Sequence, residues 1–143
     1  MEKINKLKEI LLNEKIDGYI IPKNDEFFGE YIPEYKDRLK YISNFSGSYG
    51  FAIILKNKNF LFVDGRYTLQ ANKQSSNFFN IKTNPNNLPN DILRNDKLRI
   101  GFDPKIFTNK MLNIFFRKTN CKYIPIKQNL VDKIWTKPRG KTK

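Results

Sequence analysis

The residues with the clearest chemical character are Asp64-Gly65-Arg66-Tyr67, which follow the apolar run Phe60–Val63. An apolar run that ends at Asp-Gly and is followed by helix-forming residues predicts a strand, a turn and then a helix. Free N–H groups at a helix start, with a guanidinium beside them, favour anions. A phosphate-binding loop needs several glycines at fixed spacing, and this turn has one, so it gives no nucleotide-binding signal. The alternative is a tight turn in which Asp64 caps the helix, Arg66 pairs with a carboxylate and Tyr67 is packed.

The composition removes several classes of catalytic site from this chain. It contains no histidine, which excludes a histidine general base, Ser-His and Cys-His nucleophiles and histidine-containing metal sites. The single cysteine, Cys121, provides neither an internal disulfide nor a thiolate cluster. We expect Cys121 to be a small core or edge residue.

Two acidic groupings and one tryptophan are the remaining candidates. Asp25, Glu26 and Glu30 do not have the spacing of a Ca²⁺ loop, and they predict a solvated acidic face. Asp37-Arg38 resembles a structural ion pair at a helix start, and Trp135 a packing anchor or an interface residue. None of these residues assembles a catalytic constellation.

Hydrophobic periodicity indicates which elements position these residues. Helical spacing is expected over 3–15, 37–45, 66–74, 90–94 and 108–118. Strand patterns are expected over 19–22, 51–56, 60–64, 78–82, 97–103 and 122–126, and one more apolar cluster precedes the basic end of the chain. The polar tip Asn57-Lys58-Asn59 predicts a hairpin. The segment between the first strand and Asp37 is expected to lie on the surface.

The order of these elements predicts the fold class. Helices that alternate with strands favour a sheet covered on both faces, and a tight hairpin makes at least one strand pair antiparallel. The sequence therefore predicts an α/β domain, a three-layer α/β/α arrangement around a mixed, roughly six-stranded sheet.

Length and charge narrow the class of protein. At 143 residues and 39% apolar content the chain is long enough for one domain with its own core. It has no apolar run long enough to span a membrane, and its first residues lack the apolar region of a signal peptide. We therefore expect a cytoplasmic protein.

The net charge of +13 comes from 21 Lys and 6 Arg beside 18 Asn, a pattern typical of an AT-rich genome. Proteins that recognise phosphates and bases use Arg more than Lys, so this lysine-rich composition disfavours nucleic-acid binding.

Four stretches in a fixed order resemble a known family. They are "DGYIIPKNDEFFGEYIPEYKDRLKYISNFSGSYGFAIIL", "FVDGRYTLQA", "IGFDPKIFT" and "NLVDKIW". Together they look like the N-terminal domain of long, three-domain Xaa-Pro aminopeptidases of the creatinase/aminopeptidase P family, over roughly residues 5 to 136. The family's Thr-Gly-Ser-x-Gly is here Ser46-Gly47-Ser48-Tyr49-Gly50, a mild departure.

The resemblance implies a domain organisation and a division of labour. Residues 1–136 would be a creatinase-like N-terminal domain with a ribonuclease H-like motif, and 137–143 a basic tail or the start of a linker. In this family a separate C-terminal domain holds two divalent metals, typically Mn²⁺, bound by Asp, His and Glu, and cleaves the bond before proline. Without histidine this chain holds no such centre, so we expect no catalytic residue, no metal site and no activity here. The chain would be either an excised domain or a truncated protein.

The resemblance also implies partners and contact residues. The partners would be the catalytic domain of the same parent protein, a second copy in a homodimer, and a proline-containing peptide in the full enzyme. Arg66 and Tyr67 are then the first candidates for substrate-side or interdomain contacts, and Asp37, Arg38 and the Tyr41–Gly50 loop, Tyr41 included, come next. Two alternatives remain open: a stand-alone, degenerate peptide- or partner-binding module, and a basic nucleic-acid-binding domain.

Overall fold

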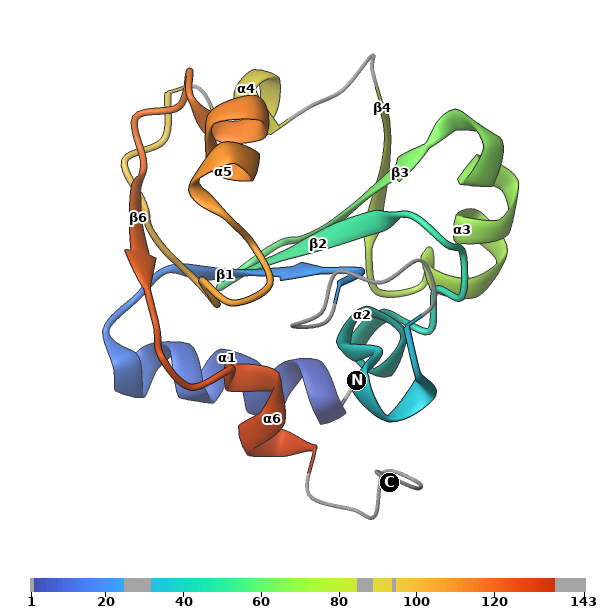
Figure 1. Cartoon of the computed structure of the whole chain (residues 1–143), viewed down its shortest axis with the longest axis horizontal. Coiled ribbons are helices and arrows are strands. Elements are labelled where there is room, and N and C mark those ends of the chain that lie inside the picture. Colours follow the sequence, from blue (N-terminus) through green and yellow to red (C-terminus); the bar gives the residue numbers. More distant parts are fainter. Residues whose placement is uncertain (1, 25–31, 85–88, 94, 136–143) are drawn as a thin grey trace.

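A six-stranded sheet lies between two layers of helices (Figure 1). The structure is a computed structural model, and it describes residues 2–24, 32–84, 89–93 and 95–135. Helices α1 (Glu2–Glu14), α2 (Arg38–Ser43), α3 (Thr68–Ser75) and α6 (Leu130–Ile134) contribute to one buried cluster. Helices α4 (Pro89–Ile92) and α5 (Asn109–Phe116) cover the other face. The three-layer α/β/α prediction is confirmed.

The sheet is mixed because one of its six strands is reversed. The spatial order is β4-β3-β2-β1-β5-β6. Strand β2 runs antiparallel to both β1 and β3, whereas the pairs β3–β4, β1–β5 and β5–β6 are parallel. The strands are β1 (Gly18–Pro22), β2 (Gly50–Leu55), β3 (Asn59–Asp64), β4 (Asn80–Asn84), β5 (Arg99–Phe102) and β6 (Lys122–Pro125). Five strands therefore end at the same edge of the sheet, where β2 begins.

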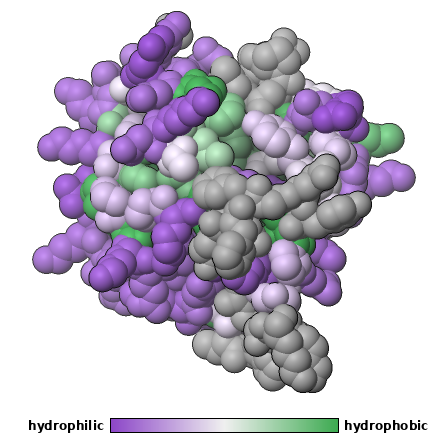
Figure 2. Space-filling model, in the orientation of Figure 1, coloured by the Kyte–Doolittle hydropathy of each residue, from purple (hydrophilic) through white to green (hydrophobic). Residues whose placement is uncertain are grey.

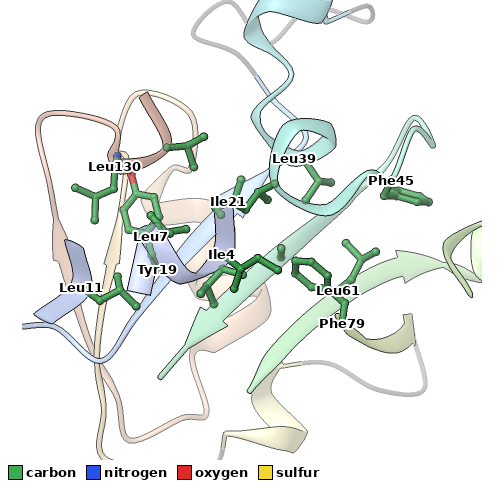
Figure 3. Packing of buried hydrophobic residues seen from close by; sticks show 14 of the residues in the cluster. Ile4, Leu7, Leu11, Tyr19, Ile21, Leu39, Phe45, Leu61, Phe79 and Leu130 are labelled. Atoms are coloured by element: carbon green, nitrogen blue, oxygen red, sulfur yellow. Dashed lines mark hydrogen bonds between the residues drawn. The ribbon is translucent and has the colours of Figure 1, made fainter. Parts of the chain in front are cut away.

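Side chains from the central strands enter two separate cores, one on each face. In β1, Tyr19 and Ile21 join the cluster under α1, and Ile20 joins the cluster under α5. Figure 3 shows Tyr19 and Ile21 beside Leu7 of α1. Strands buried on both faces have no polar side, which is why their sequences read as continuous apolar runs.

The helix boundaries follow from local capping. The Asp37 side chain accepts a hydrogen bond from the Lys40 N–H (3.1 Å), and Thr108 does the same for Met111 (3.3 Å). Asn44 ends α2 with φ 67°, in the left-handed region that Asn tolerates. These caps satisfy N–H and C=O groups that have no partner inside the helix.

Two predicted boundaries are wrong. The helix expected from Arg66 begins at Thr68, because a 3-10 turn, η2 (Gly65–Tyr67), precedes it. The strand expected from Phe78 begins at Asn80, because Phe78 and Phe79 donate backbone hydrogen bonds to Ser75 O and so complete the exit from α3.

The other predicted elements are confirmed, with ends that differ by a few residues. The hairpin forms from β2 and β3, and the apolar cluster after β6 becomes α6. The acidic residues Asp25, Glu26 and Glu30 lie outside the described residues, as does Arg94, at the end of the helix expected over 90–94. No helix in the described part of the chain is long and apolar enough to cross a membrane. The face shown in Figure 2 is mostly hydrophilic, with small hydrophobic areas between the polar side chains.

The core under α5 depends on stacked aromatic rings, which gives a first test. Phe62 is fully buried and stacks on Phe51 at a centroid distance of 5.0 Å. We expect Phe62→Ala to lower the free energy of unfolding by about 3–5 kcal/mol, because it removes the ring and leaves a cavity. Phe78→Ala is the matched control, since Phe78 is 46% exposed, and it should change stability by at most about 0.5 kcal/mol. Equal losses in urea unfolding would contradict this assignment of the core.

Candidate functional site

The five candidate residues all lie near the edge of the sheet at which the parallel strands end. Here β1 ends at Pro22, β3 ends at Asp64 and β2 begins at Gly50, on neighbouring strands. Open α/β sheets place ligand sites beyond the carboxyl ends of their strands. The structure divides the five residues into two groups, one after β3 and one on α2.

The first group is the corner at Asp64-Gly65-Arg66-Tyr67. The Asp64 carboxylate accepts hydrogen bonds from the Arg66 N–H (2.9 Å) and from Arg66 Nε (3.2 Å). The hydrogen bond from the backbone, helped by the guanidinium, holds the pKa of Asp64 below its usual value. The prediction of a capping aspartate and a paired Arg66 is confirmed. Because the Asp64 carboxylate already occupies the N–H group of Arg66, the corner itself is a poor anion-binding turn.

Arg66 and Tyr67 differ in what they offer to a partner. The Arg66 side chain is 76% exposed and its guanidinium lies 5.5 Å from the Tyr67 ring centroid. Tyr67 is half-buried: its hydroxyl pairs with that of Ser48, and its ring meets the edge of the buried Phe45 ring at 6.1 Å. Tyr67 therefore ties the corner to the neighbouring loop, and Arg66 extends into solvent.

That loop, Asn44–Tyr49, is fastened to α3 at Ser46. The Ser46 N–H donates to Gln74 Oε1 (2.9 Å), and Ser46 Oγ accepts from the amides of Gln70 (2.9 Å) and Gln74 (2.8 Å). At Gly47 a Cβ atom would lie 2.2 Å from Phe45 Cζ, so a larger residue would displace the buried ring. The Ser-Gly-Ser sequence thus fits a loop that is pressed onto Phe45.

The second group begins with a buried ion pair that connects β1 to α2. Lys23 Nζ lies 2.5 Å from Asp37 Oδ2, and the two side chains are 9% and 8% exposed. The same carboxylate caps α2 through its other oxygen. Lys23 is a functional candidate that the sequence analysis missed, because one more lysine in a lysine-rich chain carries no signal and only its burial distinguishes it.

Arg38 connects α2 to α6 rather than to its neighbour Asp37. Arg38 Nε and Nη2 bind the two carboxylate oxygens of Asp132 at 2.9 and 3.1 Å, and the Arg38 side chain is 5% exposed. The expectation that Asp37 and Arg38 pair with each other is wrong, since each pairs with a residue distant in sequence. A helix start turns successive side chains in different directions, which lets each reach a separate element.

Tyr41 completes the contact between α2 and the end of α6. Its ring stacks on Trp135 at a centroid distance of 4.4 Å, and its hydroxyl donates to Ile134 O (3.3 Å). On its other side Lys3 Nζ lies 4.2 Å from the ring centroid and donates to Tyr41 O (3.0 Å). Trp135 is confirmed as a packing residue. A cleft of about 240 Å³ opens beside it, lined by Lys3, Glu34, Asp37, Lys40, Tyr41, Asn44 and Trp135.

The start of α6 is held by buried polar groups that the sequence analysis also missed. Asn129 Nδ2 donates to Asp103 Oδ2 (2.9 Å), and its Oδ1 caps the helix by accepting from the Val131 N–H (2.9 Å). The Leu130 N–H donates to the hydroxyl of Tyr19, which Figure 3 shows pointing at Leu130. Burial raises the pKa of Tyr19, so this hydroxyl stays protonated. An asparagine before an apolar run was the available signal for this cap.

The described contacts at these residues are ion pairs, caps and ring contacts that join neighbouring elements. Among the described residues no group of three or more His, Cys, Asp or Glu side chains could hold a metal ion. Cys121 is half-buried, with its Sγ 3.4 Å from Asp96 O, as expected of an edge residue. The loop 44–49 connects the two groups, since it begins at the end of α2 and packs against Tyr67.

Comparison with known proteins places this geometry in a family. The sequence model of the Creatinase/Prolidase N-terminal domain matches residues 3–134. The probable Xaa-Pro aminopeptidase P of Coprinopsis cinerea is 35% identical over 144 residues, which cover 93% of this chain and 23% of that protein. Its counterpart in Aspergillus clavatus is 34% identical over 148 residues, 96% of this chain and 22% of that protein. The chain therefore spans less than a quarter of the length of these relatives.

Solved structures of other proteins show the same fold as this chain. The X-prolyl aminopeptidase of Caenorhabditis elegans, described as a cytosolic enzyme with a di-nuclear active site, superposes with a TM-score of 0.84 at 28% identity. The match covers 98% of this chain and 26% of that one. The N-terminal domain of a cytoplasmic peptidase from Mycobacterium tuberculosis shares the fold, with a TM-score of 0.68 at 18% identity over 93% of this chain and 98% of that domain.

The Arg38–Asp132 pair gives a test of how α2 and α6 are held together. We expect Asp132→Asn to lower the free energy of unfolding by about 1–3 kcal/mol, because it removes the charge opposite a buried guanidinium. Glu34→Gln is the matched control: Glu34 is 84% exposed and 3.4 Å from Lys40, and its loss should cost at most about 0.5 kcal/mol. If chemical denaturation gave the two variants the same stability, Arg38–Asp132 would be no structural tie.

Proposed function

The chain belongs to the creatinase/prolidase N-terminal domain family, and from that membership we propose that it serves as the non-catalytic N-terminal domain of an Xaa-Pro aminopeptidase. The observation that carries the proposal is the asymmetry of the matches: nearly the whole chain aligns, but with less than a quarter of each relative. The proposed activity of the complete protein is metal-dependent release of the N-terminal residue that precedes proline. Residues 1–136 would form the domain, and 137–143 a basic tail or the start of a linker.

The reaction centre would lie in another domain. The similar enzyme from Caenorhabditis elegans is described as di-nuclear. This chain does not fit such a centre, since it has no histidine and its described residues include no metal-binding cluster. We assign the two divalent ions, with Mn²⁺ as the proposed metal, to a catalytic domain outside this chain. The resulting division of labour leaves this domain with binding and positioning.

The proposed contact surface is the strand-end edge around Arg66. Its guanidinium is exposed and flanked by Tyr67, which in turn is fastened to the loop 44–49. An exposed arginine held beside its own carboxylate can bind a carboxylate or a peptide carbonyl on a partner surface. Asp37, Arg38 and Tyr41 act behind this surface, because their side chains hold α2 against β1 and α6.

We propose two partners for this surface, the catalytic domain of the same protein and a second copy of the chain in a homodimer. Either would bring Arg66 toward the entrance of a catalytic domain, where a proline-containing peptide would pass. The cytosolic location of the similar nematode enzyme supports a cytoplasmic location for this protein.

The division of labour predicts that the 143-residue chain is inactive alone. Incubated with an Xaa-Pro peptide and Mn²⁺, it should release no N-terminal residue, because its residue types provide no metal centre. Amino-acid release measured by chromatography checks this, with an intact Xaa-Pro aminopeptidase as the positive control. Metal-dependent release by the chain would overturn the proposal. A stop codon directly after Lys143 would favour the stand-alone binding module instead.

The contact role of Arg66 predicts a kinetic effect in the complete protein. Arg66→Ala should lower kcat/KM for an Xaa-Pro peptide by about tenfold, the loss of one charge-assisted contact. Its melting temperature should stay unchanged, since the Arg66 side chain is exposed. Arg117→Ala removes an equally charged, exposed side chain from the far layer and should leave kcat/KM unchanged. Equal kinetics for the two variants would place the contact surface elsewhere.

A further inference from the structure

A second polar site lies at the opposite edge of the sheet, where β5 and β6 begin. A cleft of about 640 Å³ opens there, lined by Lys97, Leu98, Arg99, Asn120 and Lys122. Small-molecule sites have volumes of about 300–1,000 Å³. Three of the five lining residues carry a positive charge, and none carries a negative charge.

The sheet brings two of these cations together. Arg99 and Lys122 are paired residues on the neighbouring strands β5 and β6. Both point to the face that α1 covers: Gly101, two residues after Arg99, faces Ile16 and Tyr19, and Ile124, two residues after Lys122, packs against the same cluster. Paired Cα atoms on adjacent strands are about 5 Å apart. Like charges in this position destabilise a sheet.

The Asp17 carboxylate contacts the backbone of Arg99 and the side chain of Lys56, and no ion pair of the described residues joins it to the Arg99 guanidinium. Asp17 Oδ2 accepts from the backbone N–H of Arg99 (2.8 Å), and Asp17 Oδ1 lies 3.4 Å from Lys56 Nζ. Arg99 Nε donates to the carbonyl of Lys15 at the end of α1 (3.2 Å). Within the described residues no ion pair includes Lys97, Arg99 or Lys122. The cleft therefore gathers three cationic side chains that form no ion pair within the described residues.

We propose that this cleft binds a small molecule that carries a phosphate group. A guanidinium and two ammonium groups that line one cleft can bind a phosphate dianion with charge-assisted hydrogen bonds. The Asn120 amide adds a neutral donor, and Leu98 offers apolar surface to the rest of the ligand. The lysine-rich composition explains the number of cations but not their convergence on two paired strands. The site is independent of the aminopeptidase role, which uses the other edge of the sheet.

The experiment uses the 143-residue chain at low ionic strength, with inorganic phosphate and AMP as probes. Either probe should shift the backbone amide resonances of Leu98, Arg99 and Lys122 and raise the melting temperature. The double variant Arg99→Gln/Lys122→Gln should lose at least tenfold in affinity for both. Lys73→Gln/Lys110→Gln removes the same charge from exposed sites on α3 and α5, and this variant should bind both probes as the original chain does.

The two probes also identify the kind of ligand. AMP binding at least tenfold tighter than phosphate identifies a phosphorylated organic molecule, and equal affinities identify phosphate itself.

Three results would overturn the proposal. Sodium chloride at equal ionic strength could reproduce the shifts, which would reveal general screening of a cationic chain. The two double variants could weaken binding equally, which would make net charge the cause. An oligothymidylate could bind more tightly than AMP with a steep salt dependence, which would indicate a nucleic-acid surface. Because the amide shifts are measured on the unchanged chain, the test stands even if a variant is unstable.

Discussion

The burial of the central strands on both faces is the constraint on which the rest of the structure depends. Strands β1, β2 and β3 present apolar side chains to both layers, so a polar group in the middle of the sheet would lose its water without gaining a partner. Polar chemistry is therefore confined to the two ends of the strands. The Arg66 corner lies at one end and the Arg99–Lys122 pair at the other.

The ion pairs near the Arg66 corner are of two kinds. Those with buried side chains hold elements together, and the exposed one leaves a side chain available to a partner. Lys23, Asp37 and Arg38 are buried and Asp132 is partly exposed, and each of the two pairs connects two elements, so removal of one partner weakens the hold on a buried charge. Arg66–Asp64 is exposed and spans two residues of one turn, so it orients a side chain without connecting elements. The buried pairs hold α2 and α6 in place, and the exposed pair leaves a guanidinium accessible to another surface.

Much of the architecture could be predicted because it depends on local patterns. The continuous apolar run at Tyr19–Pro22 predicts a strand buried on both faces, and Thr108 before an apolar stripe predicts a helix start. The Asp64 cap is equally local, since it involves residues two positions apart. The errors at Arg66 and Phe78 fall where a turn joins a helix, because the hydrogen bonds that decide such a boundary leave no periodic signal.

The sequence by itself determined the layer order, the six strands and the family resemblance, because each depends on residue type or on spacing along the chain. For the same reason it excluded every catalytic or metal site that needs a histidine of this chain. Only the tertiary structure decided which charges meet: Asp37 with Lys23, Arg38 with Asp132, and Arg99 beside Lys122. The physical reason is distance along the chain. Arg38 and Asp132 are 94 residues apart, and nothing but the packing of α2 against α6 brings their side chains within hydrogen-bond reach.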